Sequence, residues 1–548
     1  MFHGRTDLPS GRTAAALFAP FVSISPGSRA QDEDSRQAWK ELNSRVVAAY
    51  QAGNYVGATS LAQEALELAR RSFGDEDPAT LASMNILAEL YRSQRRYAEA
   101  EPLVVKCLEA TQRVLGEEHP DTLRSMNNLA GLYESQGRYG EAEPLYVKCL
   151  ETRRRVLGEE HPNTLQSTNN LAALHQSQGR YGEAEPLYVK CMQARRRVLG
   201  EEHPDTLSST NNLALLYKSQ GRYGEAESLY VKCLEAKRRI LGEEHPDTLL
   251  TARNLGVLLL ASGKREEGAR TFLENSRATE GWVRRSLTGL SRDASESLFG
   301  AEELATFVLV DTALAPGAKT ETATWALERI LWRKGLFGRM AARRERLSRL
   351  AASTDAEIAV LATELQDLRS QYSSLALAGP GEGVPWQSYR DELARVARRI
   401  DEIEKDLALR TKGMGVIEPP FEGAVDSVAA SLGEDGALVE VVAYRPAEHG
   451  RKVEWKPWRY AAFVLRRGAG GPVVRVTDLG AADEIDRRVT NFRKAITLER
   501  SPLSSAIDRA ARELHETIWA PLAPHLSGVR RVYFAPDGQL SLLPLAAL

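Results

Sequence analysis

The feature that most constrains this sequence is a repeat with a period of 42 residues. His-Pro pairs begin at His119, His161, His203 and His245, and Asp77-Pro78 lies one period earlier. Tyrosines recur at the same interval, at Tyr55, Tyr97, Tyr139, Tyr181 and Tyr223. A fixed period of this length is typical of a solenoid, in which each unit buries its apolar face only against its neighbours. The pattern predicts about six units between residues 36 and 287.

One unit is expected to form two helices joined by a short turn. Pro120 fits the first turn of a helix, where its missing N–H costs nothing. An apolar stripe follows at spacings of three and four, at Leu123, Met126, Ala130 and Tyr133. Gly137 is expected to end this helix in the left-handed conformation, and the second helix to run from Tyr139 to Gly158. Because Pro144 lies in the second helix, we expect either a bend or a later start there.

These hairpins resemble the tetratricopeptide repeat, and the spacing with the recurring pattern NNLA-LY-SQGRYGEAE-LY resembles the kinesin-light-chain variety. The resemblance covers units at 36–77, 78–119, 120–161, 162–203, 204–245 and a less regular 246–287. It implies an α-solenoid with a concave groove that holds a protein or peptide ligand. The partner cannot be named, because arrays of this kind bind many unrelated proteins.

Asparagine pairs recur on the first helix of three units, at 127–128, 169–170 and 211–212. By the resemblance, the second asparagine of each pair matches a position that often contacts the backbone of a bound peptide. An amide can both donate and accept, so a column of amides could hold an extended chain. The candidate peptide-binding residues are Asn128, Asn170, Asn212 and Asn254, with Glu134, Gln176 and Lys218 a turn further along. The alternative is that one asparagine of each pair serves the neighbouring hairpin.

The cysteines and histidines follow the same period, which favours structural roles. The four cysteines are Cys107, Cys149, Cys191 and Cys233. Neighbouring repeats should lie about 8–10 Å apart, beyond disulfide reach, and no CxxC pair suggests zinc. We therefore expect buried thiols that fill space, helix-capping histidines and no metal site.

Charge and composition exclude several classes of function. Lys plus Arg number 72 and Asp plus Glu 74, a net charge of −2, so no positive field attracts nucleic acid. No apolar run is long enough to span a membrane, and no GxxxxGK[ST] loop or other motif implies a cofactor. Residues 1–35 are expected to be a disordered tail, with a cleaved export signal as the alternative. A cytoplasmic location is accordingly expected, with secretion as the alternative.

The chain of 548 residues is too long for one core, and its pattern changes after the repeats. Residues 288–412 are expected to be helical, with helices over 302–314, 322–337, 339–378 and 389–411. A Gly/Pro-rich turn at 379–385 makes the last two an antiparallel hairpin, interpreted as a spacer or brace. Its facing apolar residues are predicted to be Leu361, Leu365, Leu368 and Tyr372 on one helix, and Leu393, Val396, Ile400, Ile403 and Leu407 on the other.

Residues 413–548 alternate strand and helix patterns, which predicts a partial α/β layer domain. Strands are expected over 437–444, 460–465, 473–476 and 529–535, and helices over 483–497 and 504–520. The segments 519–522, 532–540 and 543–548 resemble the opening of a CHAT domain, a caspase-like domain found attached to tetratricopeptide repeats. The run at 330–335, Ile-Leu-Trp-Arg-Lys-Gly, is similar to one in the same architecture.

The CHAT resemblance implies a cysteine peptidase whose His–Cys dyad follows later strands. The sequence ends at Leu548, before those positions, and every cysteine lies in the repeats. His515 and His525 precede the matching region. We therefore expect no catalytic residue and no peptide cleavage by this chain. Two functions remain open, a recruiting or regulatory part of a caspase-like peptidase and a non-enzymatic adaptor; the oligomeric state also remains open.

Overall fold

The computed structural model describes residues 30–51, 55–286, 292–353, 355–378, 384, 386–411, 424–449, 453–498 and 505–542. The sequence predictions for residues 1–29, for the turn at 379–383 and for the motif at 543–548 lie outside these residues. The chain divides into two compact units. The first holds residues up to Asn254 together with 279–298 and 354–404, and the second holds 255–278, 299–353 and the residues from Lys405 onward.

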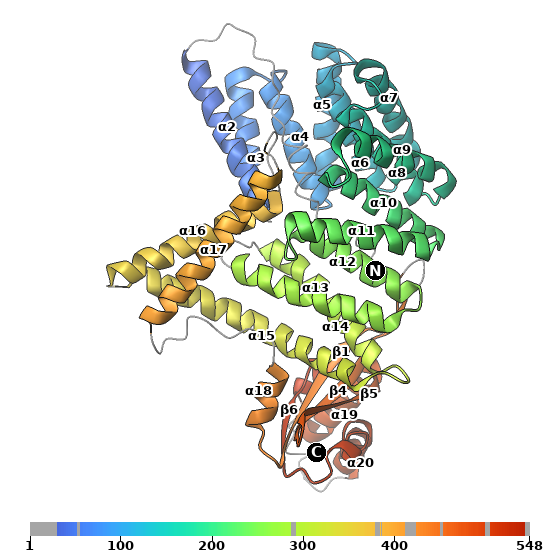
Figure 1. Cartoon of the computed structure of the whole chain (residues 1–548), viewed down its shortest axis with the longest axis vertical. Helices are drawn as coiled ribbons and strands as arrows, with labels where there is room; N and C mark the ends of the chain where they lie inside the picture. Colours follow the sequence, from blue (N-terminus) through green and yellow to red (C-terminus); the bar gives the residue numbers. More distant parts are fainter. Residues whose placement is uncertain are drawn as a thin grey trace. The chain divides into compact units, whose positions relative to one another are not determined.

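Consecutive helical hairpins make up the repeat part of the chain (Figure 1), as the sequence predicts. The helices are α2 (Ala30–Gln51), α3 (Tyr55–Phe73), α4 (Pro78–Ser93), α5 (Tyr97–Leu115), α6 (Pro120–Ser135), α7 (Tyr139–Leu157), α8 (Pro162–Ser177), α9 (Tyr181–Leu199), α10 (Pro204–Gln220), α11 (Tyr223–Leu241), α12 (Pro246–Ala261) and α13 (Arg265–Ser286). Even-numbered helices from α4 to α12 are the first helices of their repeats.

The recurring histidines cap the first helices. Nδ1 of His119, His161 and His203 accepts a hydrogen bond from the backbone N–H two residues later, at 3.2 Å in each case. His245 does the same at 3.1 Å. In the earliest of these caps, a carboxylate oxygen of Asp77 takes this role at 2.8 Å. Each cap satisfies an N–H that the helix itself leaves unpaired, so the predicted capping role is confirmed.

Glycines end both helices of a repeat. Gly137, after α6, has φ 76°, and Gly158, after α7, has φ 89°, values that suit a residue without Cβ. α7 begins at Tyr139 with Pro144 in its interior, so the predicted later start is wrong. Backbone hydrogen bonds from Glu141 and Ala142 to Arg138 already close the first turn before the proline is reached.

The space between the helices of a repeat is filled as predicted. Leu123, Met126 and Ala130 of α6 are buried, and so are Ala142, Tyr146, Cys149 and Leu150 of α7. Tyr133 is half-buried, and its ring carries the Arg138 guanidinium at 4.0 Å from the ring centre. Apolar burial and this cation–π contact together hold the turn of the hairpin.

The predicted long hairpin is present and packs within the first unit. It consists of α16 (Ala356–Ala378) and α17 (Trp386–Arg410), joined by a buried Arg369–Glu404 ion pair at 2.5 Å. The buried stripe of α16 differs in part from the prediction, because Ala362 and Arg369 lie inside while Leu361 and Leu368 are half-buried. The Tyr389 hydroxyl contacts Nε2 of His245 at 3.1 Å, which ties the hairpin to the repeats.

The helix predicted over 339–378 is wrong at its start. α15 (Thr320–Ala351) continues through Gly338, and α16 is a separate helix. Asp355 Oδ1 accepts from the N–H groups of Glu357 and Ile358, at 3.0 and 3.3 Å. This cap fixes the start of α16, whereas a glycine inside a helix costs only about 1 kcal/mol.

The second unit contains the predicted α/β layers. Its elements are α14 (Arg292–Ala313, which begins in the first unit), α15, α18 (Ala424–Ser431), β1 (Gly436–Tyr444), β2 (Ala447–His449), β3 (Val453–Trp455), β4 (Arg459–Gly468), β5 (Gly471–Ala481), α19 (Ala482–Leu498), α20 (Ser505–Leu514), a π-helical turn (His515–Trp519), a 3-10 turn (Ala523–His525), β6 (Arg531–Ala535) and a last 3-10 turn (Gly538–Leu542). The main sheet has the order β5-β4-β1-β6, with β6 parallel to β1 and the other pairs antiparallel.

Helices cover both faces of this sheet. Val442 of β1 and Phe463 of β4 pack with residues of α14, α15 and α18. Val441 and Val464, one position along each strand, pack with residues of α19 and α20 on the other face. The alternation follows from the two-residue period of a strand, and it explains why both central strands are almost wholly apolar.

Candidate functional site

The predicted peptide-binding residues lie on the first helices of consecutive repeats, and all seven are half-buried. Hydrogen bonds connect these helices in order. Arg92 of α4 donates to Ser135 of α6 at 3.1 Å, and Ser177 of α8 donates to Glu134 of α6 at 3.4 Å. Gln176 of α8 donates to Ser219 of α10, also at 3.4 Å. We call the surface formed by α4, α6, α8 and α10 the first-helix face.

The asparagines of this face form a ladder between repeats. Nδ2 of Asn170 donates to Oδ1 of Asn127, and Nδ2 of Asn212 donates to Oδ1 of Asn169, both at 2.9 Å. Asn128 makes the matching bond to Asn85 at 3.4 Å. The second asparagine of each pair therefore donates one of its two amide hydrogens to the preceding repeat, as the alternative interpretation of the sequence held.

The acceptor side of the ladder is used unevenly. Oδ1 of Asn170 accepts from Gln166 at 2.9 Å. Within the described residues, Oδ1 of Asn128 and of Asn212 takes no hydrogen bond. Asn254 lies on α12 and likewise bonds to nothing that the structure describes. Among the described residues, the amide oxygens of Asn128 and Asn212 and the whole amide of Asn254 are therefore left without a hydrogen bond.

Glu134, Gln176 and Lys218 occupy equivalent positions of successive first helices, and we call them the column. The first two of them accept hydrogen bonds from tyrosines of the second helices. The Tyr146 hydroxyl donates to Glu134 Oε2, and the Tyr188 hydroxyl donates to Gln176 Oε1, both at 3.1 Å. Sequence reasoning treated these tyrosines only as core residues. The signal that could have found them is a tyrosine twelve residues after each member of the column.

The pattern changes at α10, where Lys218 occupies the column. Its ammonium group cannot accept a hydrogen bond, and the Tyr230 hydroxyl, which is fully buried, has no partner among the described residues. The Lys218 ammonium group makes no ion pair or hydrogen bond with the described residues either. Burial lowers the pKa of the Lys218 ammonium and raises the pKa of the Tyr230 hydroxyl. The polar groups that the earlier repeats pair internally are left unpaired here.

The cysteines lie on the second helices, in the core of the hairpins. All four are free and buried, and Cys149 Sγ contacts the carbonyl oxygen of Leu123 at 3.3 Å. Burial raises the pKa of the Cys107 thiol to about 11. The predicted role as buried fillers is confirmed, and a thiol with so high a pKa holds little reactive thiolate at neutral pH.

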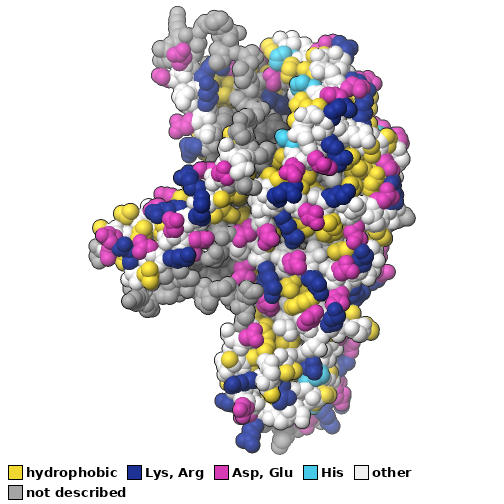
Figure 2. Space-filling model, viewed as in Figure 1, with side chains coloured by type: hydrophobic (Ala, Val, Ile, Leu, Met, Phe, Trp, Pro, Cys, Tyr) yellow, Lys and Arg dark blue, Asp and Glu magenta, His cyan; other side chains and the backbone are white. Residues whose placement is uncertain are grey.

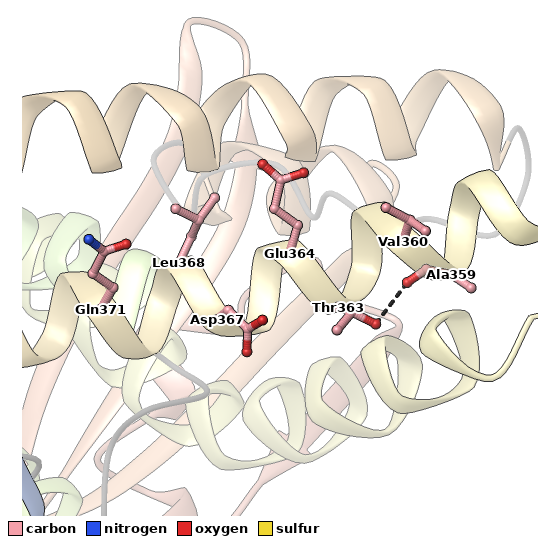
Figure 3. Close-up of a pocket in the computed structure, with 7 residues that line it drawn as sticks. All are labelled: Ala359, Val360, Thr363, Glu364, Asp367, Leu368 and Gln371. Carbon is pink, nitrogen blue, oxygen red and sulfur yellow. Dashed lines mark hydrogen bonds between the residues drawn. The ribbon is translucent and has the colours of Figure 1, made fainter.

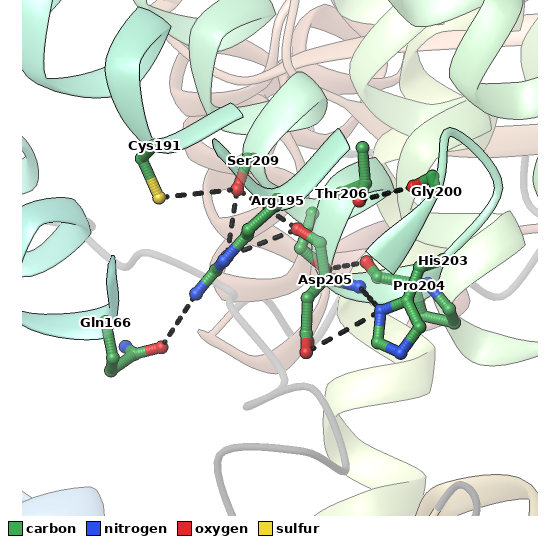
Figure 4. A network of polar contacts seen from close by, with 10 residues as sticks. Gln166, Cys191, Arg195, Gly200, His203, Pro204, Asp205, Thr206 and Ser209 are labelled. Atoms are coloured by element: carbon green, nitrogen blue, oxygen red, sulfur yellow. Dashed lines mark hydrogen bonds and ion pairs between the residues drawn. The ribbon is translucent and has the colours of Figure 1, made fainter. Parts of the chain in front are cut away.

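In three repeats, a buried cation four residues after the cysteine ties the repeat to the following one (Figure 4). Arg195 of α9 donates to the carbonyl oxygen of Asp205 at 3.2 Å and to Ser209 Oγ at 2.9 Å, and it reaches Gln166 at 3.4 Å. Arg153 and Lys237 make the corresponding backbone and hydroxyl contacts one repeat earlier and later. These cations have structural partners, so they are poor candidates for ligand binding.

A depression along α16 is lined by residues of that helix alone (Figure 3). Its charged members are Glu364, which pairs with Arg399 of α17, and Asp367.

Figure 2 shows acidic and basic side chains intermingled over the visible surface. Within the described parts of the chain, no three His, Cys, Asp or Glu side chains gather to hold a metal ion. None of the described helices has the length and apolar composition needed to cross a membrane.

Comparison with known proteins agrees with the repeat architecture. The family model "Tetratricopeptide repeat" matches residues 37–109, 85–154, 125–188, 164–239 and 210–278. No curated protein matches the chain.

Two solved structures are similar to part of this chain. BtubC (BKLC) from P. vanneervenii is 24% identical, covers 40% of this chain and 89% of its own, and has a TM-score of 0.35. A putative kinesin light chain from Podosopora anserina, with nearly identical TPR-like repeats, is 29% identical, with coverages of 37% and 96% and a TM-score of 0.33. Residues 37–278 of this chain are tetratricopeptide repeats.

Proposed function

We propose that this chain is a protein-binding scaffold whose first-helix face holds an extended peptide segment of a partner protein. The observation that carries the proposal is the row of half-buried asparagines at one-repeat intervals, Asn128, Asn170 and Asn212. The ladder holds each side chain by one N–H of its amide, and at Asn128 and Asn212 the amide oxygen remains for a ligand N–H. Acceptors held in this way suit the backbone of an extended chain, whose N–H groups need partners when water is excluded.

The test replaces the three asparagines by alanine in the full chain. We expect the N128A/N170A/N212A variant to lose at least tenfold in affinity for peptides that the wild type selects from an acetylated, amidated decapeptide library. Each neutral hydrogen bond lost should weaken binding by about 0.5–1.5 kcal/mol. A tenfold loss of affinity corresponds to about 1.4 kcal/mol. Affinity is measured by fluorescence anisotropy, and the fold is checked by circular dichroism.

A matched control changes three residues that also lie one repeat apart, on the second helices. Glu151, Gln193 and Glu235 are exposed, and no hydrogen bond or ion pair of the described chain involves them. The E151A/Q193A/E235A variant should bind as the wild type does. If the wild type and both triple variants bind equally well with their folds intact, the first-helix face is not the binding surface.

We also propose that the scaffold is the recruiting or regulatory part of a caspase-like cysteine peptidase, with a non-enzymatic adaptor as the alternative. The sequence resemblance at 519–522 and 532–540 supports the first, together with the α/β layers that contain it. In that function the repeats would bind a partner protein, and the α/β domain would connect this binding to the peptidase activity.

The chain itself should not cleave peptides through a thiol. All four cysteines are at most 1% exposed, and burial raises the pKa of each. We expect iodoacetamide to label no cysteine within an hour at pH 7.5 in the folded chain and all four in urea, followed by mass spectrometry. Turnover of a fluorogenic peptide that iodoacetamide abolishes would contradict this.

A further inference from the structure

The capping histidine before α12 is buried, unlike its equivalents in the earlier repeats. His119, His161 and His203 are half-buried, whereas His245 is 6% exposed. Tyr389 of α17 meets the His245 ring edge-on, with 6.3 Å between the ring centres. Because the other caps form without such a contact, the burial of His245 belongs to the seating of the hairpin and not to the cap.

The hydrogen bonds at His245 form a chain with a defined direction. Nδ1 accepts from the backbone N–H of Asp247 at 3.1 Å, so the proton of the neutral ring lies on Nε2. Nε2 therefore donates to the Tyr389 hydroxyl at 3.1 Å, and that hydroxyl donates to the carbonyl oxygen of Leu375 at 3.0 Å. Leu375 belongs to α16, so the chain joins the start of α12 to both helices of the hairpin. We call His245, Tyr389 and Leu375 the latch.

The hairpin also reaches the first repeat of the array. α16 packs against α2, the first helix of that repeat. The latch lies at the start of α12, the first helix of the last repeat. Repeats of a solenoid contact only their neighbours, so a hairpin that contacts both the first and the last repeat is an addition to the repeat architecture. Its two contact points flank the first-helix face, which α4, α6, α8 and α10 form.

The hairpin has a core of its own, which allows it to move as one body. Leu365 of α16 and Ile400 of α17 are fully buried, and the buried Arg369–Glu404 ion pair joins the two helices. The latch consists of one aromatic contact and two hydrogen bonds, a much smaller interaction than this core. Loss of the latch should therefore free the hairpin from α12 without unfolding it.

We propose that the α16–α17 hairpin is a strap across the first-helix face, and that the latch must open before a peptide segment enters or leaves this face. The strap joins the helices on either side of the face, so its closed form limits access to Asn128, Asn170 and Asn212. The array exchanges between a closed and an open form, and the ligand exchanges from the open form. This inference rests on the proposed peptide-binding function.

The first test measures the distance between the two ends of the array in the full chain. Lys40 of α2 and Glu243, two residues before His245, are exposed and can be changed to cysteine for a donor and an acceptor dye. The four native cysteines are buried and should not react with the dyes. Tyr389→Phe removes the latch hydroxyl and keeps the ring. We expect single-molecule energy transfer to show mostly closed molecules in the wild type, and Y389F to raise the ratio of open to closed molecules about 5- to 30-fold.

A matched pair of variants separates the latch from the helix cap. His245→Asn keeps a residue that can cap α12 but removes the imidazole that contacts Tyr389. His203→Asn makes the same change at α10, where the histidine is half-buried. We expect H245N to open the strap as Y389F does, and H203N to leave it closed. Energy transfer that stays unchanged in Y389F and H245N, or that changes equally in H203N, would overturn the strap.

The second test follows the exchange of a labelled decapeptide selected from the library used for the asparagine variants. When a ligand exchanges only from an open form, its association and dissociation rate constants both scale with the population of that form. We therefore expect Y389F to raise both rate constants about 5- to 30-fold and to leave Kd unchanged. Asn170→Ala changes the face itself and should raise mainly the dissociation rate constant. Stopped-flow anisotropy measures both.

The outcomes distinguish the strap from the scaffold function on which it rests. Peptide binding with the same rate constants in Y389F and the wild type would overturn the strap's control of access and leave the scaffold function standing. If the wild type binds no library peptide, the scaffold function fails and the control of access fails with it. Energy transfer then still decides whether the latch joins the two ends of the array. Circular dichroism of each variant confirms that the fold is present.

Discussion

The hydroxyl groups of Tyr188 and Tyr230 are expected to contribute differently to stability, because only the first has a hydrogen-bond partner among the described residues. The Tyr188 hydroxyl donates to Gln176 at 3.1 Å, whereas the Tyr230 hydroxyl is buried and unpaired. A made hydrogen bond contributes about 1 kcal/mol, and an unmade one in a buried site costs about 1–3 kcal/mol. The two residues occupy equivalent positions, so their substitutions can be compared directly.

We therefore expect Tyr188→Phe and Tyr230→Phe to change stability in opposite directions. Y188F should lower the free energy of unfolding by about 1 kcal/mol, because Gln176 Oε1 loses its donor. Y230F should leave it unchanged or raise it, because no bond is broken and a buried polar group is removed. Urea unfolding followed by circular dichroism measures both. Equal losses in the two variants would mean that the Tyr230 hydroxyl is paired in solution.

His175 gives the array a dependence on pH. It stands where Tyr133 and Tyr217 carry Arg138 and Arg222 on their rings, at 4.0 and 3.9 Å. Burial, and then the nearby Arg180, lower the pKa of His175 below 6.5. The unfolded chain therefore takes up this proton before the folded chain does, and stability falls as the pH falls below about 6.5.

His175→Tyr should remove this part of the pH dependence and add a ring beneath Arg180. We expect the midpoint of thermal unfolding to rise at pH 7.5, by an amount matching about 0.5–1 kcal/mol. The rise should be larger at pH 5.5, where the wild type bears the cost of protonating His175. Differential scanning fluorimetry at the two pH values gives the comparison. A rise that is the same at both values would exclude His175 as the titrating group.

At the scale of elements, one ion pair connects a helix to the sheet in the second unit. Lys334 of α15 binds the Glu440 carboxylate of β1 and donates to the carbonyl oxygen of Val441 at 3.1 Å. Burial raises the pKa of Glu440, and Lys334 opposes that rise. A buried charge that loses its partner is strongly destabilising, so this pair fixes how α15 lies on β1.

Lys334→Met should lower the free energy of unfolding by about 3 kcal/mol at pH 7.5, because the Glu440 carboxylate is then buried alone. The loss should shrink as the pH falls, since the pKa of Glu440 is raised and the protonated carboxyl is cheaper to bury. Chemical unfolding at several pH values tests this. The double variant K334M/E440L should recover most of the loss, and a double variant as unstable as K334M would contradict the explanation.

Local signals located most elements correctly, and the exceptions have physical causes. The predicted strands at 437–444 and 460–465 correspond to β1 and β4, because a fully buried strand is an apolar run between turns. The predicted helix start after Gly338 is wrong, because α15 continues through that glycine and a cap at Asp355 begins the next helix, α16. The periodicity also could not show that Lys218 would leave Tyr230 unpaired, since that depends on which side chains meet across two helices.

At the scale of the whole molecule, the candidate site was harder to predict than the fold. The 42-residue period identified the hairpins, and with them the face on which Asn128, Asn170 and Asn212 lie. The period alone does not show that each of these amides donates to the repeat before it. That contact joins residues 43 apart, one period plus one residue, and it exists only because adjacent helices are offset when they pack.

This offset makes the joints between the repeats interchangeable. The bond from Asn170 to Asn127 and the bond from Asn212 to Asn169 are the same joint made twice, with the same length. A gene that gains or loses one unit of this kind between like neighbours keeps every joint intact. The face can therefore be lengthened or shortened in whole units, and the size of the partner segment it accommodates can change in steps while each step of the array stays as stable as before.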